Sequence, residues 1–152
     1  MKRLMLLAAV VCLGASNLAL GATAGKARKT TGVIHAGVTH SEAADVYVAG
    51  DLKDKLLGRG AIVYITRVSP GPDVGSVQIK ARKITIYTTK GSLSGTGQAT
   101  QTNMADGKAS VTDGTFRLRK GTGRLKGHRL SGTFSGAFAD GVYTFNYKGT
   151  LR

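Results

Sequence analysis

Four tyrosines stand out among the residues that could do chemistry, because each lies in a segment with the alternation of a β-strand. They are Tyr47, Tyr64, Tyr143 and Tyr147. A strand that borders a cavity could place these hydroxyls where they orient a ligand or transfer a proton. A tyrosine in a strand more often packs its ring in the core with its hydroxyl at the rim. Both roles stay open, because one bulge reverses the face to which the following side chains point.

The three histidines match no metal-binding or catalytic spacing. His40 is followed by Glu42 and Asp45, a group that could begin a metal site or an acid–base pair. That segment has the composition of a solvent-exposed turn, and the spacing of His35, His40 and His128 fits no metal signature. We therefore predict no metal site and no cofactor.

Two further carboxylates, Asp51 and Asp54, lie in the segment Gly50–Gly60, which is predicted to be a loop with at most one helical turn. One role for them is a carboxylate pair at the mouth of a cavity. The sequence favours a plainer role, in which they act as a helix N-cap and as a surface charge beside Lys53 or Lys55. No catalytic residue is assigned on this basis.

Basic residues dominate the charge of the chain. It has 22 Lys and Arg against 8 Asp and Glu, which gives a formal net charge of +14. Such an excess attracts nucleic acid, acidic polysaccharide or lipid headgroups. Several basic residues alternate along predicted strands and are expected to share an outer face: Lys80, Arg82, Lys83, Arg117, Arg119, Lys120, Arg124, Lys126 and Arg129. Aromatic residues are not interleaved with them, so the sequence does not predict specific nucleic-acid recognition. It predicts instead that the basic face binds anionic polymers weakly.

The N-terminus has the pattern of a secretory signal peptide. Met1-Lys2-Arg3 precedes an apolar run and then small residues, with a cleavage point near Ala24. The run is too short for a comfortable transmembrane span. Cys12, the only cysteine, lies within it, so the mature protein would have neither disulfides nor a catalytic thiol. We predict a secreted or periplasmic protein with a signal peptide over residues 1–24, a basic disordered arm over 25–31 and one domain over 32–152.

The domain is predicted to be all-β. Eight segments have strand character, covering residues 32–39, 45–49, 61–68, 76–89, 93–99, 108–119, 130–138 and 143–151. The last two flank Asp140-Gly141, a dipeptide suited to a tight hairpin turn. The apolar parity slips near Arg82-Lys83 and near Asp113-Gly114, where we predict bulges. Long strands bent by glycines and bulges favour a single eight-stranded antiparallel barrel with short turns, with a β-sandwich as the alternative.

Two stretches of the chain resemble the allene oxide cyclase and dirigent barrel superfamily. One contains Gly121-Thr122-Gly123, Leu125 and Gly127, followed by the strand Tyr143-x-Phe145-x-Tyr147-x-Gly149. The other is Ala49–Ala61. The Gly-Thr-Gly triplet also looks like part of a phosphate loop, but no Gly-Lys-Ser/Thr follows, so it is predicted to be a strand turn. The resemblance implies a calycin-like barrel with a central cavity, often assembled as a homotrimer.

The resemblance does not carry over a catalytic residue. Leu125 replaces the usual aromatic, and His128 and Leu130 replace the alanine and glycine that the family favours. The active-site cysteine of the plant cyclases has no counterpart. The fold is therefore expected to transfer while the chemistry is left open.

The functional prediction is an exported barrel that binds a hydrophobic small molecule and, if it is an enzyme, guides cyclisation or stereoselective coupling by shape, as an isomerase or cyclase would. The residues predicted to line its cavity are Tyr47, Tyr64, Phe134, Tyr143, Phe145 and Tyr147. The alternative is a non-catalytic exported protein whose basic face binds an anionic envelope polymer.

Overall fold

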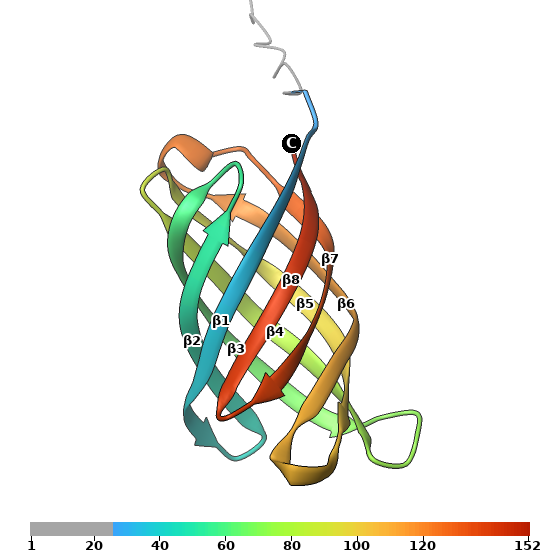
Figure 1. Cartoon of the computed structure of the whole chain (residues 1–152). Coiled ribbons are helices and arrows are strands. Elements are labelled where there is room, and N and C mark those ends of the chain that lie inside the picture. Colours follow the sequence, from blue (N-terminus) through green and yellow to red (C-terminus); the bar gives the residue numbers. More distant parts are fainter. Residues whose placement is uncertain (1–25) are drawn as a thin grey trace, which may run out of the picture.

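The chain folds as a closed barrel of eight antiparallel strands that follow one another in sequence order (Figure 1). The computed structural model describes residues 26–152. The strands are β1 (Arg28–Glu42), β2 (Asp45–Asp54), β3 (Gly58–Pro70), β4 (Ser76–Thr88), β5 (Gly91–Asn103), β6 (Ala109–Gly121), β7 (Leu130–Ala139) and β8 (Val142–Leu151). The predicted barrel is thus confirmed, and closure of the sheet excludes the sandwich.

Two 3-10 helices, η1 (Ala105–Gly107) and η2 (Gly123–Leu125), lie in the connections between strands. None of the helices within residues 26–152 has the length and apolar character needed to cross a membrane. The predicted signal peptide lies outside the described residues.

Strand β1 closes the barrel, because it pairs with both β2 and β8. Its pairing with β8 begins at Arg28 opposite Leu151 and continues to Gly37 opposite Val142. Residues 28–31 are therefore part of the barrel, and the prediction that residues 25–31 form a disordered arm is wrong for them. Lys29 and Thr31 are exposed on either side of the buried Thr30, which is the alternation of an ordinary strand.

The segment Gly50–Gly60 is mostly strand rather than loop. Strand β2 continues to Asp54 and β3 begins at Gly58, so the turn is limited to residues 55–57. Leu52 and Asp54 keep the parity of Val48, and all three are buried. The predicted surface position of Asp54 is therefore wrong, because the strand carries this carboxylate to the inside.

Both predicted bulges are present. The pairing of β4 with β5 shifts between Ala81 and Ile84, and the pairing of β6 with β7 shifts between Val111 and Gly114. Each bulge restores an inward apolar face on both sides of the slip, as the buried Ala81 and Ile84 show. Asp113 takes up the second irregularity with a φ of 53°.

The hairpin between β7 and β8 also has the predicted turn. Asp140 and Gly141 have φ values of 52° and 78°, the left-handed geometry that a two-residue hairpin requires. The turn aligns Phe138 with Tyr143 and Leu130 with Leu151 along the two strands. The aromatic residues of both strands are thereby brought to one inner face.

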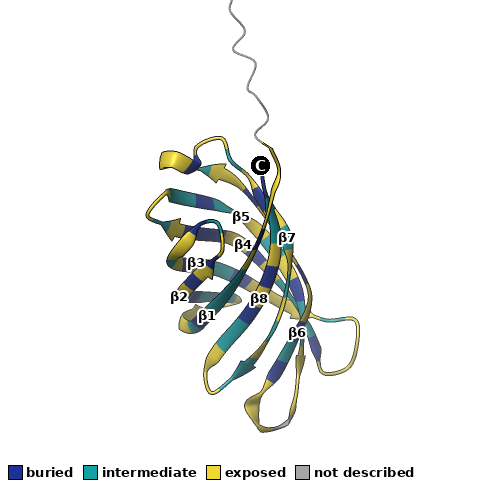
Figure 2. Cartoon of the chain, turned by 45° about the horizontal axis from the view of Figure 1, so that its top comes forward, coloured by how far each residue is buried: buried dark blue, intermediate teal, exposed yellow. Residues whose placement is uncertain are grey.

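The two ends of the barrel differ. The end that contains the β2–β3, β4–β5 and β6–β7 connections, here called the closed end, is filled by a leucine plug (Leu52, Leu57, Leu93, Leu125, Leu130 and Leu151), all buried. Helix η2 places Leu125 in this plug, which explains a leucine after the Gly-Thr-Gly turn. The other end is called the mouth. Figure 2 shows exposed residues alternating with buried and half-buried ones along the strands, as expected where one face of each strand is solvated.

Candidate functional site

The barrel contains an internal cavity of about 270 Å³ above the leucine plug. Its wall is mainly aliphatic and aromatic, and none of its lining residues is charged; examples are Ile34, Val48, Ile62, Ile84, Val111 and Phe145. Val68 and Asn103, at the mouth ends of their strands, also line the cavity and are exposed. The cavity therefore opens at the mouth and ends blindly at the plug. Its volume lies just below the usual range for ligand sites, roughly 300–1,000 Å³, which suits a small ligand.

Polar side chains line the part of the cavity nearest the mouth. The Tyr143 hydroxyl donates a hydrogen bond of 3.1 Å to Oε1 of Gln101, and Nε2 of Gln101 donates one of 2.9 Å to Oδ1 of Asn103. Gln101 and Asn103 share a face of β5 and lie across the barrel from β8. A ligand that enters with its apolar part first would leave its polar group among these side chains.

The phenols of Tyr64 and Tyr143 remain protonated in this cavity at ordinary pH. Burial raises the pKa of Tyr64 well above its usual value, and the nearby Tyr143 raises it further. Burial likewise raises the pKa of Tyr143. A low-dielectric wall disfavours the phenolate, so these groups act as hydrogen-bond donors rather than as bases. They can stabilise an oxygen that gains negative charge during a reaction.

An aromatic ladder runs along β7 and β8 from the mouth toward the closed end. Phe138 contacts Tyr143 at a ring-centroid distance of 4.6 Å, and Tyr143 stacks on Phe145 at 5.4 Å. Phe145 meets Phe134 edge-on at 5.3 Å. Gly136 makes room for this ladder, because a Cβ there would lie 2.8 Å from the Phe145 ring. The aromatic rings thus pack into a continuous wall, with Gly136 leaving the space that the Phe145 ring fills.

The buried carboxylate of Asp54 organises the floor beneath the cavity. It accepts hydrogen bonds from the Thr30 hydroxyl at 2.8 Å and from the Tyr147 hydroxyl at 2.5 Å. It also accepts the backbone N–H groups of Leu56 and Leu57, at 2.7 and 2.6 Å, which fixes the turn that carries the plug. Burial, followed by the hydrogen bond to Asp54, raises the pKa of Tyr147. Asp54 therefore holds together the end of the barrel rather than facing a substrate.

The structure brings together five of the six residues predicted to line the cavity. Tyr64, Phe134, Tyr143, Phe145 and Tyr147 all line it. The sixth, Tyr47, is not among its lining residues.

Tyr47 lies on the outer face, because its neighbours Val46 and Val48 point inward. It contacts the ring of His40 at a centroid distance of 5.5 Å. The prediction for Tyr47 is wrong because the alternation of β2 turns Val46 and Val48 to the cavity and Tyr47 to the outside.

The remaining polar candidates lie outside the cavity. His35 shares a hydrogen bond of 3.1 Å with Thr144 on the exposed surface, and Asp51 is exposed on β2. Asp45 forms ion pairs with Arg67 and Arg82. Within residues 26–152, no group of three or more His, Cys, Asp or Glu side chains is arranged to hold a metal ion.

The sequence does not predict that Gln101 and Asn103 line the cavity, because a strand end with polar residues facing a cavity has the same pattern as a strand end exposed to solvent. Their position in the strand does indicate the inner face, since both continue the inward series of Leu93, Gly97 and Ala99.

The chain matches no protein-family model, no curated protein and no solved structure.

Proposed function

We propose that the barrel binds a neutral hydrophobic small molecule in its internal cavity. The observation that carries this proposal is the apolar cavity itself, about 270 Å³ in volume, open at the mouth and without a charged lining residue. A carboxylate or ammonium group placed inside would lose its hydration without gaining a partner of opposite charge, which is costly. The ligand is therefore uncharged over the part that enters.

The polar end of the ligand carries an oxygen that accepts hydrogen bonds. Tyr64 and Tyr143 supply protonated phenols, and Gln101 and Asn103 supply amides close to the mouth. One carbonyl, hydroxyl or epoxide oxygen at the end of an apolar body satisfies this pattern. In an otherwise apolar site, a few polar groups that form hydrogen bonds with the ligand fix its orientation.

The same geometry supports a finer proposal, that the barrel guides the cyclisation or stereoselective coupling of its ligand. The wall formed by Phe134, Tyr143 and Phe145 restricts the shapes that a flexible chain can adopt, and restriction to a reactive shape lowers the barrier. The phenols can stabilise charge on an oxygen without acting as bases. This chemistry agrees with the sequence resemblance to allene oxide cyclases and dirigent proteins.

We further propose that the protein is exported and that residues 1–24 are removed. The charged start and apolar run of the sequence support this. Strand β1 begins at Arg28, so cleavage after Ala24 would leave all eight strands intact. Expression of the full chain in a bacterium, followed by N-terminal sequencing of the exported fraction, tests it. Exported protein that still begins at Met1 would contradict it.

A matched pair of substitutions on β5 tests ligand binding. Ala99 is buried, lines the cavity and packs against Val111 and Phe145, whereas Thr96 is exposed on the same strand. Ala99→Phe fills the cavity and should abolish the fluorescence enhancement of an uncharged apolar dye. Thr96→Phe, which adds the same ring outside, should leave the enhancement unchanged.

The dye is titrated at low and at high salt, with circular dichroism confirming that both variants are folded. Binding to the wild type should not depend on salt, because the cavity is uncharged. The proposal fails if the wild type takes up no dye, or if both variants reduce uptake equally.

A further inference from the structure

The net positive charge of the barrel is concentrated at its closed end. Residues 26–152 contain 20 of the 22 basic residues and all 8 acidic ones, because only Lys2 and Arg3 lie outside. Fifteen of these basic residues lie at the closed end, either within four positions of a strand terminus there or in the adjoining segments: Lys26, Arg28, Lys29, Lys53, Lys55, Arg59, Lys90, Arg117, Arg119, Lys120, Arg124, Lys126, Arg129, Lys148 and Arg152. The same region contains two acidic residues, Asp51 and Asp54. The rest of the barrel has five basic and six acidic residues. The excess charge is thus +13 at the closed end and −1 elsewhere.

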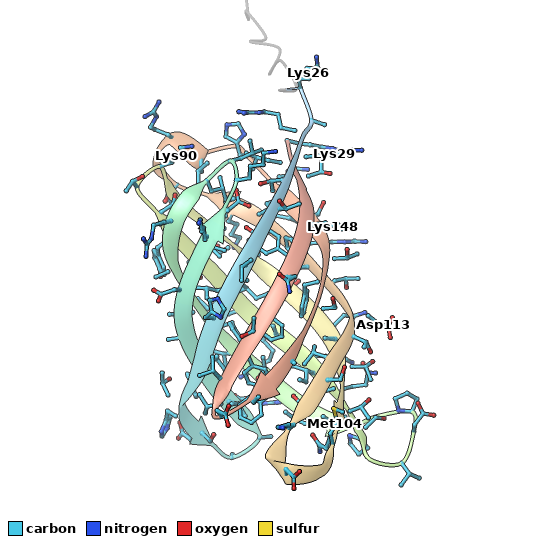
Figure 3. All side chains as sticks on the ribbon, in the orientation of Figure 1. Lys26, Lys29, Lys90, Met104, Asp113 and Lys148 are labelled. Carbon is cyan, nitrogen blue, oxygen red and sulfur yellow. The ribbon has the colours of Figure 1, made fainter. Side chains whose placement is uncertain are left out.

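This distribution differs from the single outer face that the sequence predicted. Lys80, Arg82 and Lys83 lie away from the closed end, in or beside a bulge of β4. Figure 3 shows Lys26, Lys29 and Lys90 at the end of the barrel where the C-terminus lies, and Met104 at the opposite end. The charge is therefore arranged along the barrel axis.

Within residues 26–152, none of the basic side chains of the closed end forms an ion pair, and Lys90 alone among them donates a hydrogen bond, to the backbone oxygen of Leu56. All fifteen are exposed. Both ion pairs found in the described part of the chain, those of Arg67 and Arg82 with Asp45, lie elsewhere. Residues 114–139, which include the connection from β6 to β7, contain six basic residues and no acidic one. Like charges held this close repel one another, and an anionic partner relieves that repulsion.

An open groove on the outside of the barrel extends this basic surface. It has a volume of about 1100 Å³ and crosses the outer faces of β2, β1, β8, β7 and β6. Three lysines line it, Lys53, Lys55 and Lys148, together with the hydroxyls of Thr31 and Thr133 and the amide of Asn146. Two carboxylates also line it: that of Asp54, which is buried, and that of Asp113, which lies away from the closed end. Ammonium groups beside hydroxyl and amide groups match a chain that carries both carboxylates and hydroxyls.

The same surface does not suit a membrane or a nucleic acid. Of the seven exposed large hydrophobic residues in residues 26–152, only Tyr87 lies near the closed end, while Val68, Val74, Met104 and Val142 lie near the mouth. A membrane-binding end would present apolar side chains for insertion, and a binding surface for single-stranded nucleic acid would present a series of aromatics for stacking.

We propose that the closed end and its groove form a docking surface for an acidic polysaccharide. Binding there directs the mouth of the cavity away from the polymer, so the docked barrel can still exchange its ligand. This inference rests on charge and on the outer groove, and it stands whether or not the cavity proves to bind a ligand.

Two charge-matched triple variants test the docking surface. Lys53→Glu, Lys55→Glu and Lys148→Glu together reverse the charge in the groove. Lys80→Glu, Lys83→Glu and Lys108→Glu together make the same change in net charge away from the closed end. Affinity for polygalacturonate is measured for both and for the wild type, with neutral dextran as the polymer control. The groove variant should bind more than tenfold more weakly, and the control variant within about threefold of the wild type.

Three further outcomes would overturn the proposal. Equal weakening by both variants would show that net charge alone matters. Tighter binding at equal salt to phosphatidylglycerol vesicles or to single-stranded RNA than to polygalacturonate would assign the surface to another class of partner. Raising the salt from 50 mM to 1 M shortens the Debye screening length by a factor of about four. If wild-type binding is unchanged over this range, the contact is not electrostatic. Apolar dye uptake by the groove variant, measured alongside, reports on the cavity independently.

Discussion

The Tyr147 hydroxyl of β8 donates a 2.5 Å hydrogen bond to Oδ2 of Asp54 on β2, across the strand that lies between them. Gly32 of β1 is paired with Asp54 on one side and with Tyr147 on the other. A Cβ at Gly32 would lie 2.4 Å from a Tyr147 ring carbon. The glycine therefore leaves the space through which the tyrosine reaches the carboxylate, and three strands are fastened together below the cavity.

Gly32→Ala should destabilise the barrel, because the new methyl group and the Tyr147 ring cannot share this space. We expect the free energy of unfolding to fall by about 1–3 kcal/mol. In a Tyr147→Ala background the same substitution should cost far less, which a double-mutant cycle measured by denaturant unfolding would show. Gly37→Ala on the same strand is the control, since its Cβ would have no neighbour closer than 3.6 Å. Additive effects of Gly32→Ala and Tyr147→Ala would contradict this explanation.

Asp54→Ala should be among the most destabilising single substitutions in the chain. It leaves the Thr30 and Tyr147 hydroxyls and the N–H groups of Leu56 and Leu57 without their acceptor. Unsatisfied buried donors of this number cost about 3–5 kcal/mol. Asp51→Ala, on the exposed face of the same strand, should change stability by less than about 0.5 kcal/mol. Chemical denaturation of both variants measures the two losses in the free energy of unfolding. Similar losses would contradict the structural role assigned to Asp54.

Much of the architecture was predictable because it depends on local chemistry. Asp140-Gly141 specifies its turn, and the parity slips at Arg82-Lys83 and Asp113-Gly114 locate two of the bulges. These features are set by neighbouring residues along the chain. Asp54 could not be placed in the same way, because its four donors include groups on β1 and β8 that only barrel closure brings near.

The cavity was predictable only in part for the same physical reason. Phe134, Phe145 and the C-terminal tyrosines share the parity of one long hairpin, so their common face could be deduced from its turn. The face of Tyr47 depends on which side of β2 turns to the inside when the barrel closes, and Gln101 looks like a solvated residue until β8 is seen to face it.

Stability should fall steeply at alkaline pH because of Tyr147. Its pKa is raised in the folded state, so above pH about 10 the unfolded chain loses the phenolic proton while the folded chain keeps it. The stabilising contribution is therefore complete below pH about 10 and is lost as the pH rises, by about 1.4 kcal/mol for each pH unit. Tyr147→Phe should remove that part of the slope, although it lowers stability at neutral pH. Urea denaturation between pH 8 and pH 11.5 provides the measurement, and identical slopes in the two proteins would contradict the assignment.

Tyr143→Phe should discriminate between ligands that differ by one oxygen. The Tyr143 hydroxyl donates its single proton to Oε1 of Gln101, an acceptor that a ligand oxygen would replace, and the raised pKa of Tyr143 keeps the proton on the hydroxyl. A matched pair of probes, a cyclic ketone and the corresponding hydrocarbon, isolates this contribution. Loss of one hydrogen bond should weaken ketone binding about fivefold to tenfold, since such a bond contributes roughly 1 kcal/mol, while hydrocarbon binding stays within about twofold. Tyr47→Phe on the outer face should change neither affinity. If Tyr143→Phe weakens both probes alike, the substitution has altered the shape of the cavity, and the hydroxyl does not recognise the oxygen.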